Sequence, residues 1–316
     1  MADVPAVVGR ASATPTPRYT YVTWWENVAF SATHLALAAF LSCTSLRTLY
    51  RCGRLFGTIE WMIDYKRRRR FTAVFERVQG PGAAPAQRRS ATREYFRRSR
   101  CDKLFYLLFD RIPHDTVMSL FSFRNRELLD DAVRRGRGVY LAMSHHGPQH
   151  IAGMLLAAHG YAAAAVRDRQ EGGLRRWVQE RLDRRYPQFR RMRVLFADGY
   201  PRDIYRCLRE GYVLGSAMDV SRLRRPNQRA QEVSIFGEKR RFLSGPVHIA
   251  LRCGAPVLQA FIVPEKYFHY RLEIVKALAE PQTPGDEDAI VARVMSDYAA
   301  NVEKYIRATP ALITRI

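Results

Sequence analysis

Short apolar runs alternate with amphipathic stretches over the second half of the chain. The runs that we expect to form strands are Val139–Met143, Ala162–Val166, Val194–Phe196, Val213–Ala217, Val233–Phe236, Val257–Val263 and Arg271–Val275. Several of the segments between them have helical spacing, and a long amphipathic helix is predicted to begin near Asp286. This alternation is typical of an α/β domain with a layered, mostly parallel sheet flanked by helices. We expect it to occupy residues 136–316.

The first 135 residues show helical patterns instead of alternation. Residues 1–20 are rich in Pro, Ala, Ser and Thr without the order of a signal peptide, and we interpret them as a flexible tail. Residues 21–70 form an apolar and then basic helical region. Residues 71–135 form a second helical region, which contains a Gly/Pro linker at Gln79–Pro85.

The apolar part of the first helical region, Asn27–Leu46, contains 20 residues without Asp, Glu, Lys or Arg. It is long enough to span a bilayer, although its Ser and Thr content makes it a weak spanner. Trp24 and Trp25 stand at one end, and the basic cluster Lys66–Arg70 follows. Aromatic and basic side chains in these places favour attachment to an anionic membrane surface. A buried core helix and a basic arm for nucleic acid are the alternatives.

Charge narrows the choice of partners. The chain carries 52 Lys and Arg against 30 Asp and Glu, a formal net charge of +22. Such a field favours anionic lipid, phosphorylated substrates and carriers, or nucleic acid. Arginines spread over solvated faces are the simpler alternative. We expect no nucleic-acid partner, because the Arg-rich segments offer few interleaved aromatic platforms.

The most informative segment is the polar turn after the expected strand Val139–Met143, which holds His145, His146 and His150. Ligands and catalytic groups of α/β sheets gather at such strand ends. The turn has no HExxH order, and the five cysteines are scattered without a CxxC, so we expect no metal site and no disulfide framework. Histidines with only a structural role in the turn remain an alternative to a catalytic base. The sequence has no Gly-x-Ser-x-Gly elbow for a covalent serine route.

The order of these motifs resembles the lipid A lauroyl/myristoyl acyltransferase family, within the lysophospholipid acyltransferase superfamily. The family turn, a histidine followed after four residues by a carboxylate, corresponds to His145–His150. Leu208–Asp219 resembles the strand of the family that leads to an aspartate, and Val233–Gly237 resembles its Phe-Phe-Gly segment. Leu243–Val257 resembles its Gly-Pro, helix, Gly-Ala-Pro-Val passage. The family also carries an arginine after its second strand, and Val166–Arg169 stands at the corresponding place in this chain.

The resemblance implies an acyltransferase that moves an acyl group from an acyl carrier protein or acyl-CoA thioester to a hydroxyl. It implies no cofactor and a place on the cytoplasmic face of the inner membrane. His145 would be the general base and His150 its neighbour in the catalytic turn. Substrate-binding roles would fall to Arg167, Arg169, Asp219 and Arg222. Arg222 begins an arginine-rich run, for which a solvated basic loop without a binding role is the alternative.

The chief departure from the family is His150, which stands where a Glu or Asp orients the catalytic histidine. A neutral imidazole supplies no negative charge, and losing a charge-assisted partner costs about 1.5–3 kcal/mol. Three explanations stay open: a carboxylate from elsewhere, such as Asp168 or Asp219; an amine acceptor; or a repurposed member that binds lipid. The ending Ala311–Ile316 also lacks the Trp/Arg-rich pattern of the lipid A enzymes.

Overall fold

A seven-stranded sheet forms the centre of the protein, in the strand order β1-β9-β8-β2-β5-β3-β4. The computed structural model describes residues 22–80, 82–167, 173–197, 199, 201–219, 228–281, 283 and 285–313. The strands of this sheet are β1 (Phe121–Arg124), β2 (Val139–Met143), β3 (Ala163–Arg167), β4 (Arg193–Phe196), β5 (Val213–Ala217), β8 (Val257–Pro264) and β9 (Tyr270–Ala279). The five strands from β8 to β4 are parallel. The β9 strand runs antiparallel to β8, and β1 is parallel to β9. The predicted α/β class and mostly parallel sheet are confirmed.

Each of the seven predicted strands is present; the bounds of β2 and β5 agree with the prediction, and those of the others differ by up to four residues. The segment predicted as Val233–Phe236 is β6 (Ala230–Ile235), which pairs with β7 (Glu238–Leu243) in a separate antiparallel hairpin. The pattern did not predict β7 or β1. β7 is largely polar and β1 has only four residues, so neither shows a clear apolar run.

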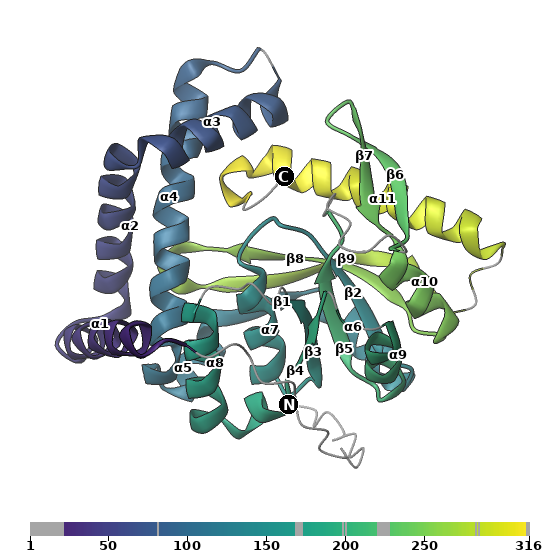
Figure 1. The fold of residues 1–316 in the computed structure, drawn as a ribbon, viewed down its shortest axis with the longest axis horizontal. Helices are drawn as coiled ribbons and strands as arrows, with labels where there is room; N and C mark the ends of the chain where they lie inside the picture. The colour runs from purple at the N-terminus through teal and green to yellow at the C-terminus, as the bar shows by residue number, and fades with distance from the viewer. Residues whose placement is uncertain are drawn as a thin grey trace.

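Helices cover both faces of the sheet (Figure 1). The described α-helices are α1 (Trp24–Ser42), α2 (Leu46–Ile63), α3 (Tyr65–Gln79), α4 (Pro85–Leu108), α5 (His114–Leu120), α6 (Arg126–Arg134), α7 (Gln149–Ala158), α8 (Gly173–Arg185), α9 (Pro201–Arg209), α10 (Gly245–Arg252) and α11 (Glu287–Ala308). One face packs on α7 and the C-terminal part of α4, and the other packs on α10 and α11. The side chains of β2 alternate between the two cores, with Leu141 in one and Tyr140 in the other.

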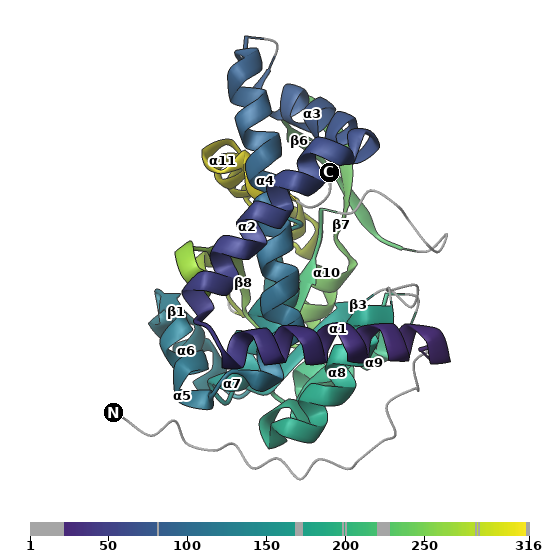
Figure 2. The same ribbon diagram turned by 90° about the vertical axis from the view of Figure 1, so that its left-hand side faces the viewer.

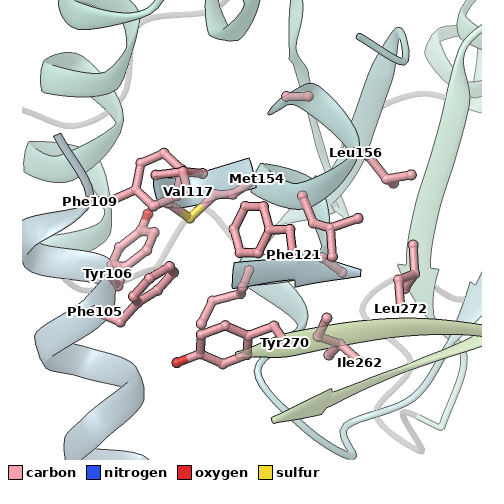
Figure 3. Close-up of a cluster of buried hydrophobic side chains, with 14 of the residues drawn as sticks. Phe105, Tyr106, Phe109, Val117, Phe121, Met154, Leu156, Ile262, Tyr270 and Leu272 are labelled. Atoms are coloured by element: carbon pink, nitrogen blue, oxygen red, sulfur yellow. The ribbon is translucent and has the colours of Figure 1, made fainter. Parts of the chain in front are cut away.

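The first core is rich in aromatic rings that join α4 to the sheet (Figure 3). Phe105 of α4 lies 4.9 Å from the ring of Tyr270 on β9, measured between centroids, and Phe109 is stacked on Phe121 of β1. All four side chains are buried. The core therefore fixes α4 against one edge of the sheet, which matters because α4 contributes a wall to the cavity described below.

The apolar segment Asn27–Leu46 is not one continuous helix. The helix α1 ends at Ser42, and α2 begins at Leu46 after a short break that is capped by the side chain of Ser45. Figure 2 shows α1, in dark purple, lying across the body of the protein, with α2 rising from its end beside α4. Within the described part of the chain, no helix combines the length and the hydropathy that a bilayer-spanning segment needs.

One side of α1 packs on the rest of the protein and is hydrogen-bonded to it, and the other side is exposed. The imidazole Nε2 of His34, a buried side chain, lies 2.8 Å from Asp110 Oδ1, and the indole N–H of Trp177 donates to Asn27 Oδ1. By contrast, the side chains of Trp24 and Trp25 are 65% and 74% exposed. The buried-core-helix alternative therefore holds for only one side of this helix.

Candidate active site

The turn that carries the histidines begins at the carboxyl end of β2, the central strand of the seven-stranded sheet, which has parallel neighbours on both sides. All five residues of β2 are buried, so the strand is a rigid support. At Gly147 the backbone has φ +82°, and a Cβ there would overlap the carbonyl oxygen of Ile262 on β8. Glycine is therefore needed where the turn passes β8 before α7 begins at Gln149.

His145 is held by Asp219. Asp219 Oδ1 lies 2.7 Å from His145 Nδ1, and Asp219 Oδ2 accepts a 2.7 Å hydrogen bond from the backbone N–H of the same histidine. Asp219 follows β5, the strand next to β2, so the two residues come from neighbouring carboxyl ends. A carboxylate at Nδ1 favours the tautomer with the proton on Nδ1, which places the basic lone pair on Nε2.

His150 lies in the first turn of α7, half-buried, with its ring edge-on to Tyr106 of α4 at a centroid distance of 4.7 Å. Burial lowers the pKa of His150 well below its usual value, and the positive charges of Arg175 and Arg167 lower it further. We therefore expect a neutral imidazole at this position. The negative charge beside His145 comes from Asp219, one of the two carboxylates that the sequence offered for this role.

The remaining predicted site residues divide into two groups. Arg167, at the end of β3, lies in the same cavity as His145 and His150. Arg169, Arg222 and Asp168 lie outside the described residues, so their substrate-binding or supporting roles remain predictions from the sequence. Asp219, expected to bind substrate or support the site, makes its contacts with His145.

The cavity in front of His145 has a volume of about 1460 Å³. Its apolar lining includes Met143, Leu156, Leu174, Met192, Leu195 and Ile204. Its described charged lining consists of Arg67, Arg98, Lys103, Arg167, Arg175, Arg229 and Arg252, with Asp102 and Asp203. The excess of positive charge favours an anionic ligand. The apolar wall provides space for a hydrocarbon chain.

Several residues of the site were missed by the sequence reasoning. Asp102 of α4 lines the cavity and accepts a 2.9 Å hydrogen bond from the hydroxyl of Tyr270; burial raises the pKa of Asp102 to about 7. His248 of α10 also lines the cavity, and its Nδ1 lies 2.7 Å from Glu287 Oε1. Neither Asp102 nor His248 stands in a turn after an apolar strand, so no local pattern marks them.

Over the described ranges, no three His, Cys, Asp or Glu side chains are gathered closely enough to hold a metal ion. All five cysteines are described, and each is a free thiol.

The comparisons with known proteins identify the family. The sequence profile of the bacterial lipid A biosynthesis acyltransferases matches residues 25–312, so the chain belongs to this family and is an acyltransferase. A search of curated proteins finds no match. Among solved structures, the 1-acyl-sn-glycerophosphate acyltransferase of Thermotoga maritima is similar at 14% sequence identity and a TM-score of 0.36. That alignment covers 83% of this chain and 96% of the other.

Proposed function

We propose that this acyltransferase moves an acyl group from an acyl carrier protein or acyl-CoA thioester directly to a hydroxyl group of a lipid-like acceptor. His145 acts as the general base. The observation that carries the proposal is the contact of His145 Nδ1 with Asp219 in a cavity that is both cationic and apolar. An oriented imidazole with a carboxylate partner is the arrangement that general-base catalysis requires.

The reaction follows from this arrangement. Nε2 of His145 takes the proton of the acceptor hydroxyl as the oxygen attacks the thioester carbonyl carbon. Asp219 stabilises the imidazolium that forms, because its carboxylate already accepts from Nδ1 at 2.7 Å. The tetrahedral intermediate then collapses, the C–S bond breaks, and the departing thiolate takes the proton from His145. No acyl-enzyme forms, and the site needs no cofactor.

Asp219 also explains how the site can function with a histidine at position 150, where the family has a Glu or Asp. A carboxylate that approaches from β5 supplies the negative charge that a histidine at position 150 does not. This supports an active catalyst that uses a hydroxyl acceptor over a member that has lost catalysis. The amine acceptor becomes an outcome of the acceptor screen described below.

The cavity lining supports the substrate class. Arg167 and Arg175 lie near His150, since their charges lower the pKa of its imidazole. Guanidinium groups bind phosphate oxygens strongly, and both proposed donors carry a phosphopantetheine phosphate. The apolar wall that includes Leu156 and Met192 is placed to take the acyl chain. We propose that the arginines bind the polar head group of the donor or acceptor and that the apolar wall binds the hydrocarbon chain.

Transfer assays with purified protein test the proposal. Labelled acyl carrier protein and acyl-CoA are each offered with a panel of lipid acceptors that carry a hydroxyl or an amine. We expect transfer to a hydroxyl acceptor from one of the two donors, and a loss of at least about a thousandfold in His145→Ala. Absence of transfer with every donor and acceptor, or transfer by His145→Ala at the wild-type rate, would overturn the proposal. Transfer only to an amine would replace the acceptor class.

Membrane attachment is proposed through the exposed sides of α1 and α2, at an anionic surface such as the cytoplasmic leaflet of the inner membrane. The exposed apolar side chains of these helices include Trp24, Trp25, Leu35, Leu55, Phe56, Ile59, Met62 and Ile63. Exposed apolar patches of this kind mark interaction sites, and the basic start of α3 adds attraction to anionic lipid. The surface is suited to lying in the lipid interface.

Vesicle co-sedimentation tests the attachment. The double variant Ile59→Ser/Ile63→Ser removes two exposed apolar side chains from α2, and we expect it to lower binding to anionic vesicles roughly tenfold or more. The matched control, Ile59→Val/Ile63→Val, changes the same two exposed positions but keeps them apolar, and it should bind the vesicles like the wild type. Equal vesicle binding by the double variant and the wild type would refute this surface.

A further inference from the structure

The C-terminal segment Thr309–Ile313 lies against the histidine turn. The backbone N–H of Gly147 donates a 2.8 Å hydrogen bond to the carbonyl oxygen of Leu312, and His146 forms an antiparallel β-bridge with Ile313. The Ile313 side chain is fully buried. Two consecutive turn residues, immediately after His145, are therefore bound to a segment more than 160 positions away in the sequence.

A side-chain hydrogen bond adds a third connection. The hydroxyl of Thr309 donates to the carbonyl oxygen of Tyr305 at 3.1 Å, so its oxygen can accept from His146 Nε2, 2.9 Å away. This assigns the proton of the neutral His146 ring to Nε2. The other ring nitrogen, Nδ1, is buried without a hydrogen-bond partner, as expected for an unprotonated nitrogen. Burial lowers the pKa of His146 to about 4, which keeps the ring neutral near pH 7.

The ring of His146 is also confined by aromatic neighbours. It meets Phe261 of β8 and Tyr305 of α11 edge-on, with centroid distances of 5.8 Å and 6.3 Å. Those two rings are stacked on each other at 3.9 Å. The position of the His146 ring therefore depends on the end of α11 and on the segment after it.

We propose that the segment Thr309–Ile313 positions the catalytic turn, and that Thr309 is a positioning residue for His145. This inference rests on the proposed function of His145. Asp219 fixes the imidazole from the β5 side, while the segment fixes the following two residues from the α11 side. Ala311 and Leu312 also line the cavity, so the same segment forms part of its wall. A small shift of a catalytic base is enough to slow the chemical step.

The test compares two substitutions at Thr309. Thr309→Val keeps the branched shape and removes the hydroxyl, while Thr309→Ser keeps the hydroxyl. The backbone oxygen of Thr309, 3.2 Å from His146 Nε2, remains as an acceptor, so the loss in the valine variant is partial. We expect kcat to fall about tenfold in Thr309→Val, equivalent to about 1.4 kcal/mol. The KM of the donor should change less than twofold, and Thr309→Ser should restore kcat.

Amide hydrogen exchange across residues 144–150 gives a readout that does not depend on catalysis. In Thr309→Val the amide of Gly147 should exchange at least fivefold faster than in the wild type. The matched control is Thr72→Val, which removes another threonine hydroxyl that donates to a carbonyl four residues earlier, on α3 and away from the turn. It should leave the exchange of Gly147 as in the wild type.

The outcomes separate the two proposals. Wild-type kcat and wild-type exchange in Thr309→Val would overturn the positioning role while leaving the proposed function intact. A rise in KM with kcat unchanged would also overturn it, because it would indicate a role in binding. If the wild type itself transfers no acyl group, the proposed function fails, and with it the role toward catalysis.

Discussion

Replacing Asp219 by asparagine isolates the contribution of its charge. The carboxylate makes two hydrogen bonds of 2.7 Å with His145, one to Nδ1 and one to the backbone N–H. Both partners are donors. An asparagine of the same shape has one carbonyl oxygen and one NH2 group, so it can accept only one of the two bonds.

The expected fall in kcat of Asp219→Asn follows from the one hydrogen bond that the asparagine cannot make. A hydrogen bond to a charged group contributes about 1.5–3 kcal/mol. When the imidazolium forms in the transition state, a loss of this size slows the reaction roughly 10- to 150-fold. We therefore expect kcat of Asp219→Asn to fall within that range. The KM of the donor should change little, because His145 rather than Asp219 faces the cavity.

Release of the thiol from the acyl donor, followed by a chromogenic reagent at saturating acceptor, measures this kcat. Asp115→Asn is the matched control, since Asp115 is an exposed aspartate of α5 that does not line the cavity. It should keep kcat within about twofold of the wild type. The reasoning is refuted if Asp219→Asn retains wild-type kcat while His145→Ala is inactive.

Two further substitutions test the surroundings of the site. Gly147→Ala should lower the free energy of unfolding by about 1–3 kcal/mol and abolish most activity, because the new Cβ would overlap the Ile262 carbonyl oxygen. Thermal melts measure the loss of stability. Gly160→Ala is the control: Gly160 also has a positive φ, +83°, but lies in open space, so this variant shows the cost of backbone strain alone. Asp102→Asn should gain stability relative to the wild type as pH rises. The pKa of Asp102 is raised to about 7 in the folded protein, so between about pH 4 and pH 7 the folded state keeps a proton that the unfolded chain has lost. The contribution of Asp102 to the free energy of unfolding of the wild type therefore falls as the pH rises through this range. Urea unfolding of both proteins at pH 5 and pH 8 checks this, and an equal difference at the two pH values would contradict it.

Local patterns were sufficient for much of the fold. The apolar run that became β2 is buried at all five positions, and the run of β5 is buried at its first two; such runs stand out because every position is apolar or small. The turn after β2 was recognisable for the same reason, since three histidines follow directly on a buried strand. The family resemblance added the expectation that His145 is the base.

What the sequence left open depends on contacts between distant residues. The choice of Asp219 over Asp168 required the order of the strands, because β5 and not β3 lies next to β2. The bond between His146 and Thr309 joins residues 163 positions apart, and no local periodicity encodes it. The break between α1 and α2 was missed because Cys43 and Thr44 continue the uncharged run that predicted a single segment.

We propose direct transfer from a thioester with His145, oriented by Asp219, as the base. Single-turnover experiments test it most directly, with labelled acyl donor bound to wild-type protein, His145→Ala or His145→Gln and then mixed with acceptor. We expect the wild type to convert the bound acyl group to acylated acceptor without label remaining covalently on the protein, and both variants to be slower by about a thousandfold or more. A variant that transfers at the wild-type rate, or a labelled acyl-enzyme in the wild type that forms and decays at the rate of turnover, would contradict it.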